Sequence, residues 1–197
     1  GTPRAGALGV VALVGIAASA VVSGAEAQGT WSEVAPLSEE RVRLAAGVVD
    51  GKLYAVGGEH RTAGTSWQAR STVEVYDPAT DTWAPVTPLP SPRASLAAGV
   101  VDGKLYAVGG LYAGQVLSKV EVYDPATDTW SEVAPMNGPR RSFAAGVVDG
   151  KLYAVGGYDG GGGTDFVGTV EAYDPATDTW TQKASLPTLR AYLTAGV

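Results

Sequence analysis

The sequence predicts an all-β fold in which small four-stranded sheets repeat around an axis, a β-propeller. The segment "AAGVVDGKLYAVGG" occurs three times without change, at Ala45–Gly58, Ala97–Gly110 and Ala144–Gly157. Each copy is followed, after a loop of variable sequence, by a segment that ends in "DPATDTW". These segments are short, rich in Val and Tyr and bounded by turn residues, which is typical of β-strands. Self-similarity at such a long period indicates a repeat architecture and not a single irregular domain.

Each unit is predicted to hold four strands, here called a to d. In the second unit Leu96–Val101 is strand a and Lys104–Gly110 is strand b, while Val120–Tyr123 and Thr129–Val133 are strands c and d. Asp-Gly between two apolar runs is a strong hairpin signal because its turn needs positive φ. The four strands therefore form an antiparallel meander. Strand a is almost entirely Ala, Gly and Val, which predicts the crowded innermost position. The Gly pair at the end of strand b predicts a close approach of two backbones.

These residues resemble the kelch repeat. The shared pattern is a Gly-Gly doublet, then a Tyr, then a Trp, and an Arg that opens the next unit. The opening arginines are 52, 47 and 50 residues apart. The Tyr, Trp and Arg positions are Tyr76, Tyr123, Tyr173, Trp83, Trp130, Trp180, Arg41, Arg93, Arg140 and Arg190. The resemblance covers about Trp31 to Val197 and implies a propeller, commonly of six or seven blades, whereas only three complete units are present.

The ends of the chain are interpreted as follows. Residues 1–27 have the layout of a signal peptide, with an uncharged run at Ala5–Gly24 and small residues at Ala25 and Ala27. The alternative is an N-terminal membrane anchor. Residues 28–197 are predicted to be an incomplete kelch propeller with units beginning near 41, 93, 140 and 190. "TWSEVAP" at Thr30–Pro36 repeats Thr129–Pro135, so we expect a strand d at the N-terminus and a strand a at the C-terminus.

Composition excludes several classes of function. The net charge of −6 argues against nucleic acid as the partner. The absence of cysteine excludes disulfides and thiolate metal sites, and a single histidine, His60, leaves no nucleophilic triad. Galactose oxidase is a copper enzyme on a kelch-like propeller. Its copper ligands include histidines and its cofactor is a Tyr–Cys link, whereas this segment has one histidine and no cysteine. Gly160–Gly163 is expected to be a loop tip and not a phosphate cradle, because no Lys-Ser/Thr follows it. No cofactor and no metal are predicted.

The repeated aspartates of "DPATD" are predicted to be architectural. The first Asp suits the first position of a turn, and the Pro presets φ at the next position. A calcium loop would need further oxygen ligands, a Gly at its sixth position and a Glu at its twelfth, and neither is present.

A comparison of the repeats separates two faces. In a meander, the a–b and c–d turns lie at one end of the blades and the b–c and d–a connections at the other. The turns are nearly invariant, while the b–c loops differ completely. The turn face has nine Asp and three Lys, a net charge of −6. The loop face has a net charge of +4 from Arg41, Arg43, Arg61, Arg70, Arg93, Lys119, Arg140, Arg141, Arg190, Glu39, Glu40, Glu59, Asp159 and Asp165.

Two interpretations of the opening arginines stay open. They form a basic ring on the loop face, or they make structural ion pairs with Glu74, Glu121 and Glu171. Kelch substrate adaptors resemble this chain here, because their ligand-contacting Arg and Ser residues lie just after the opening Arg. The candidate binding residues are Arg43, His60, Arg61, Trp67, Arg70, Ser95, Tyr112, Arg141, Ser142, Tyr158, Phe166 and Tyr192.

Three functions are compatible with the sequence. The first is a secreted or cell-surface binding module whose loop face holds a protein, a peptide or a glycan, with an acidic peptide or glycan favoured by the charge. The second is the N-terminal part of a carbohydrate-active enzyme with catalytic residues in further blades, since no catalytic residue is predicted here. The third is a structural domain of a larger surface protein. A membrane contact is expected only if residues 1–27 are not cleaved.

Overall fold

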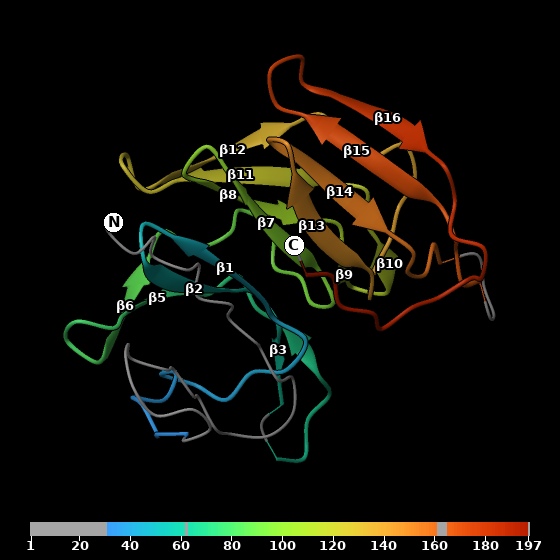
Figure 1. The fold of residues 1–197 in the computed structure, drawn as a ribbon. Coiled ribbons are helices and arrows are strands. Elements are labelled where there is room, and N and C mark those ends of the chain that lie inside the picture. Colours follow the sequence, from blue (N-terminus) through green and yellow to red (C-terminus); the bar gives the residue numbers. More distant parts are fainter. Residues whose placement is uncertain (1–30, 62, 161–164, 197) are drawn as a thin grey trace, which may run out of the picture.

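The computed structural model describes residues 31–61, 63–160 and 165–196. The predicted signal peptide and residues 161–163 of the predicted loop tip lie outside the described residues. Within them are sixteen β-strands and no helix, so no described helix could cross a membrane. Twelve of the strands form three four-stranded antiparallel sheets, which stand side by side as propeller blades (Figure 1).

Each blade is the predicted meander. The four strands of each sheet follow one another from the axis outward in chain order, and two short hairpins extend the b–c loops. Blade 1 consists of β1 (Ala45–Val49), β2 (Lys52–Val56), β5 (Val73–Asp77) and β6 (Thr82–Val86). Blade 2 consists of β7 (Ala97–Val101), β8 (Lys104–Val108), β11 (Val120–Asp124) and β12 (Thr129–Val133). Blade 3 consists of β13 (Ala144–Val148), β14 (Lys151–Val155), β15 (Val170–Asp174) and β16 (Thr179–Lys183). The hairpins are β3 (Glu59–His60) with β4 (Gln68–Ala69), and β9 (Leu111–Tyr112) with β10 (Gln115–Val116).

The innermost strands confirm the prediction made for the small-residue segments. Strand β7 lies between β1 and β13. A Cβ added at Gly47 would lie 2.6 Å from Leu105 Cδ1 of the next blade, and one added at Gly99 would overlap Leu152 Cδ1. The third position of strand a is glycine because a leucine of the neighbouring blade fills the space.

The hydrophobic cores lie between blades and not inside a single sheet. Val49 and Tyr54 of blade 1 pack against Leu105 and Tyr123 of blade 2. The rings of Tyr54 and Tyr123 are 5.8 Å apart, within the range of favourable aromatic pairs. The same positions join blades 2 and 3. Identical repeats thus supply both halves of each interface, which explains why their sequence hardly varies.

Blade 3 has no following blade among the described residues, and the side chain that such a blade would cover is exposed. Val49 and Val101 are 2% and 3% exposed, whereas the equivalent Val148 is 45% exposed. Val49 and Val101 are covered by the blade that follows, and no further blade covers Val148 among the described residues.

Both terminal segments occupy positions of the repeat. Ala35 makes the same two hydrogen bonds as Thr87 and Ala134, which directly follow strand d in blades 1 and 2. Gly157 N donates to Arg190 O over 2.7 Å, as Gly58 N does to Arg93 O over 3.0 Å. Neither segment is one of the sixteen described strands, and Glu33 forms an isolated bridge.

Candidate interaction surface

The alternating strand directions place the turns and the loops at opposite ends of the blades. We call the surface of the a–b and c–d turns the constant face. The surface of the b–c loops and the d–a connections is called the variable face, and it includes both small hairpins (Figure 1). The two faces differ in how their polar side chains are used.

On the constant face, the second Asp of each "DPATD" holds the preceding unit. In blade 2, Asp128 Oδ1 accepts from the Tyr123 hydroxyl at 2.7 Å and from Thr87 N at 2.9 Å. Trp130 Nε1 donates to Thr87 O at 2.9 Å. The backbone N–H and C=O of Thr87 are thus both hydrogen-bonded to blade 2. We call this arrangement the clamp, and blades 1 and 3 repeat it with Asp81, Tyr76, Trp83, Ala35, Asp178, Tyr173, Trp180 and Ala134.

The clamp shifts the pKa of both of its side chains. The backbone N–H of Thr87, followed by the hydroxyl of Tyr123, lowers the pKa of Asp128 below its usual value. Burial, followed by the hydrogen bond to Asp81, raises the pKa of Tyr76 to about 12. The carboxylate is thus held ionised and the phenol neutral, as the shared hydrogen bond requires.

The first Asp of the motif shapes its own turn. Asp124 Oδ1 accepts from Ala126 N at 3.0 Å, and Asp124 Oδ2 pairs with Lys104 Nζ at 2.9 Å. The hydrogen bond from Lys104 is the main reason why the pKa of Asp124 is lowered. The prediction that the repeated acids are architectural is confirmed by these contacts. Among the described residues, no three His, Asp or Glu side chains gather in a way that could hold a metal ion.

Three of the four opening arginines, Arg41, Arg93 and Arg140, are structural, as the second interpretation held, whereas Arg190 is exposed. Arg93 is 0% exposed, and its Nη2 donates to Glu121 Oε2 at 2.6 Å and to Ala107 O at 3.2 Å. Arg41 pairs with Glu74 and Arg140 with Glu171 in the same way. Burial lowers the pKa of Arg93, and the nearby charge of Glu121 opposes this shift.

The predicted net charge of +4 for the variable face is therefore wrong. Arg41, Arg93 and Arg140 are buried and neutralised, so six cations and five carboxylates of the predicted set remain, a net charge of +1. Most of the predicted excess of positive charge belongs to these three side chains, which are buried. The sequence could not show this, because a buried and an exposed arginine look the same in a repeat.

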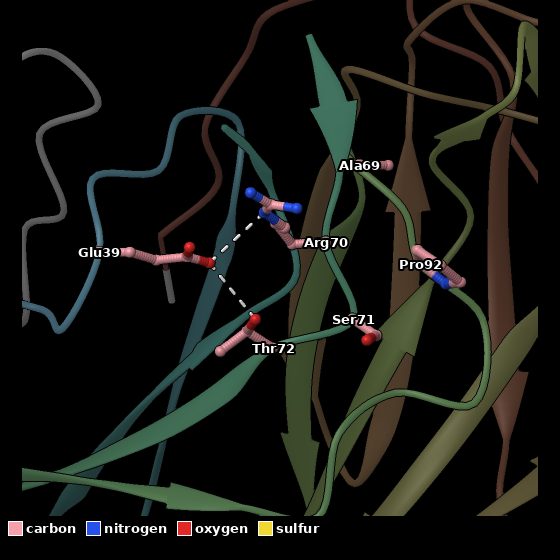
Figure 2. A pocket seen from close by; sticks show the side chains of 6 residues that line it. All are labelled: Glu39, Ala69, Arg70, Ser71, Thr72 and Pro92. Atoms are coloured by element: carbon pink, nitrogen blue, oxygen red, sulfur yellow. Dashed lines mark hydrogen bonds and ion pairs between the residues drawn. The ribbon is translucent and has the colours of Figure 1, made fainter. Parts of the chain in front are cut away.

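Three further cations of the face are already paired, and the first, Lys119, lies 3.2 Å from Glu121 and 3.0 Å from Glu132. Arg43 Nη1 lies 2.6 Å from Glu59 Oε1. Arg70 Nε lies 3.6 Å from Glu39 Oε1, which also accepts from Thr72 Oγ1 at 3.4 Å. Figure 2 shows Glu39 reaching across from the segment before β1 to Arg70 and Thr72. The hollow at this place measures about 400 Å³ and includes Pro92 in its wall.

A belt of backbone hydrogen bonds runs across the variable face. Ser95 N donates to Arg43 O at 2.8 Å, Ser142 N to Ser95 O at 2.9 Å, and Tyr192 N to Ser142 O at 2.8 Å. All four residues have a φ between 52° and 55°, the left-handed region. Non-glycine residues there cost about 1–3 kcal/mol each and cluster at binding sites. The belt brings together four predicted site residues, each two positions after an opening arginine.

Exposed aromatic side chains gather on the same face. Trp67, Tyr112, Phe166 and Tyr192 are 48%, 45%, 36% and 67% exposed. The first three come from the b–c loops of blades 1, 2 and 3, and Tyr192 comes from the belt. By contrast, the repeated Tyr76, Tyr123 and Tyr173 are each 2% exposed.

The aromatic side chains of the third loop form a cluster. The Tyr158 ring lies 4.6 Å from Phe166 and 5.7 Å from Tyr192, between ring centroids. The Arg141 guanidinium carbon lies 4.7 Å from the Tyr158 centroid, a cation–π contact. Beside this cluster is a pocket of about 660 Å³ between the β9–β10 hairpin and the third loop.

The first loop places its candidate residues apart from this cluster. Arg61 lies 5.3 Å from the Trp67 ring centroid, and His60 Nδ1 is 2.7 Å from Glu40 O. Sequence reasoning did not select Leu111, Val116 or Asp165, which line the pocket. Their only signal was their position in loops that differ between repeats.

Known proteins match the chain as follows. The family model described as "Kelch motif" matches residues 40–90, 92–137 and 139–187. Human Kelch-like protein 33 is 41% identical over 83 residues, which are 42% of this chain and 15% of that protein. Kelch-like protein terF of Aspergillus terreus is 42% identical over 85 residues, 42% of this chain and 18% of that protein. The chain therefore spans less than a fifth of the length of these relatives. The solved structure of YjhT matches with a TM-score of 0.73 at 18% identity, over 82% of this chain and 57% of that one, which confirms the propeller fold.

Proposed function

Because the chain belongs to the kelch-repeat family, with three matched motifs, we propose that it is a protein-binding module whose variable face holds the partner. The observation that carries the proposal is the set of exposed aromatic side chains on that face, Trp67, Tyr112, Phe166 and Tyr192. Aromatic residues are enriched in protein interfaces and supply much of their binding energy.

The rigid scaffold beneath these side chains supports the same proposal. The belt fixes the backbone at Arg43, Ser95, Ser142 and Tyr192, and the loops carry the residues that vary. A fixed base with variable loops is the usual arrangement of a recognition surface. Since the exposed charge of the face is nearly balanced, apolar anchors and not a basic ring select the partner.

The test is a selection of binding peptides from a displayed library on the chain, followed by titration of variants with the selected peptide. Trp67→Ala, Tyr112→Ala and Phe166→Ala are each expected to weaken binding about tenfold or more. The control is Asp102→Asn on the constant face, which keeps a residue suited to the φ of 49° at that position. Peptides whose affinity falls with Asp102→Asn and not with the aromatic variants would contradict the proposal.

We also propose that the module is secreted, on the strength of the uncharged segment Ala5–Gly24 and the small residues Ala25 and Ala27. Expression with a secretion pathway should yield a chain in the medium that begins at Gln28. Mass spectrometry of the N-terminus checks this, and a cell-associated chain that retains Ala5–Gly24 would favour a membrane anchor.

A further inference from the structure

The pocket beside the third loop has walls of two kinds. Leu111 and Val116 of the β9–β10 hairpin supply apolar surface, and Gly160 lies so close to Val116 that an added Cβ would be 2.8 Å from its Cγ2. Asp159 and Asp165 supply carboxylates. The volume of about 660 Å³ is within the range of about 300–1,000 Å³ usual for ligand pockets.

Asp165 differs from the aspartates of the constant face. The acids of the clamp and of the turns receive hydrogen bonds from Tyr, Lys or backbone N–H groups, as Asp128 and Asp124 show. Asp165 Oδ2 is shielded from solvent and has no hydrogen-bond partner in the part of the chain that the structure describes. A buried acceptor without a donor is destabilising, and more so when it is charged. The carboxylate therefore lacks solvation at Oδ2 until a donor or a cation reaches it.

The one cation of the pocket does not meet this need. Arg141 is stacked on the Tyr158 ring, and no ion pair joins it to Asp165 among the described residues. With two carboxylates and one guanidinium, the lining has a net charge of −1. The Tyr158 ring already contacts Arg141 and Phe166, which leaves less of its surface for a ligand to stack on.

We propose that this pocket takes a basic side chain, Lys or Arg, of the partner protein. The methylene stem packs against Leu111 and Val116, and the charged head pairs with the Asp165 carboxylate. Such side chains have an apolar stem and a cationic end, which matches the two kinds of wall. The proposal rests on the proposed function, because the side chain belongs to a protein held on the variable face.

The test is an NMR titration of the 15N-labelled chain with N-acetyl-arginine amide and N-acetyl-lysine amide. A single side chain is expected to bind with a dissociation constant of about 1 mM, and it should shift the amides of Gly114 and Gly160. N-acetyl-citrulline amide, which has nearly the same shape without the charge, should bind at least tenfold more weakly. Asp165→Asn should abolish the preference for the charged probe, whereas Asp102→Asn should leave it unchanged.

Equal binding of the citrulline and arginine probes, or no shift at Gly114 and Gly160 with either basic probe, would overturn the proposal. Binding of N-acetyl-glutamate amide in their place would assign the pocket to Arg141 and to an acidic partner. These outcomes are separate from the proposed function. If Asp165→Asn leaves the affinity of a selected peptide intact while Trp67→Ala lowers it, the variable face binds protein and only the basic side chain is refuted.

Discussion

The constant and the variable face are built on the same strands, yet their polar groups make different contacts. On the constant face, the acids of the "DPATD" turns bind the backbone or a lysine of the same chain, as Asp128 and Asp124 do. On the variable face, hydrogen bonds between backbone groups hold the belt, and side chains such as Tyr112 and Trp67 are exposed. Turns that use their side chains for structure cannot vary, whereas loops held by backbone groups can.

The largest expected change in the free energy of unfolding concerns two arginines of the variable face. Arg93→Ala should destabilise the chain by about 3–5 kcal/mol, because it leaves Glu121 buried with Lys119 as its remaining cation. Arg43→Ala removes a pair whose arginine side chain is 51% exposed and should cost less than about 1 kcal/mol. Denaturant unfolding of the two variants measures the difference. Equal effects would mean that burial does not separate the two arginines.

A second test compares two glycines at opposite ends of strand β8. Gly109 and Gly103 both have positive φ, but a Cβ at Gly109 would lie 2.5 Å from Arg140 O, and one at Gly103 would meet nothing within 4 Å. Because Asn tolerates this φ, Gly109→Asn should cost at least about 1–3 kcal/mol more than Gly103→Asn. Thermal unfolding checks this. A variant at Gly103 as unstable as one at Gly109 would show that φ alone, and not the approach of the next unit, requires glycine.

A third test uses pH to isolate the clamp. The pKa of Asp128 is lowered from 3.8 in the folded chain, so its stabilising effect is present above that value and is lost as pH falls through the folded pKa. Asp128→Asn should lower the melting temperature at neutral pH and make it less dependent on pH below about pH 5. At low pH the variant and the parent chain should converge. A constant difference at all pH values would show that the charge of Asp128 has no part in the clamp.

The smallest effect is expected for the exposed pair of Lys104 and Asp124. Lys104→Gln should change the melting temperature by no more than the error of the measurement, because solvent and salt screen this contact. The turn keeps its hydrogen bond from Ala126 N to Asp124. A large loss of stability that disappears at high salt would contradict this ranking.

The fold was predictable from the sequence because the repeats carry it. The segment "AAGVVDGKLYAVGG" predicts the hairpin, the inner strand of small residues and the close backbone approach at Gly109. The structure confirms each of them. The clamp was predictable only as turn chemistry. Its bond partner, Thr87 of the preceding unit, is 41 residues away, and no local pattern points to it.

The variable face was predictable in its position but not in its charge. Arg93 and Arg43 have the same chemistry in sequence, and only packing shows that the first is 0% exposed. The cluster of Arg141, Tyr158 and Phe166 depends on how a loop without a repeat folds back. Asp165 looks like any surface acid until the absence of a donor to Oδ2 is seen.

The close approach at the glycine pairs sets an order of assembly during synthesis. Gly58 N donates to Arg93 O, and Gly110 N donates to Arg140 O, so each strand b is secured by the opening arginine of the following unit. A ribosome must therefore make the start of one repeat before the preceding repeat can reach its final state. We therefore expect a chain halted within a repeat to leave strand b of its last complete sheet without this hydrogen bond.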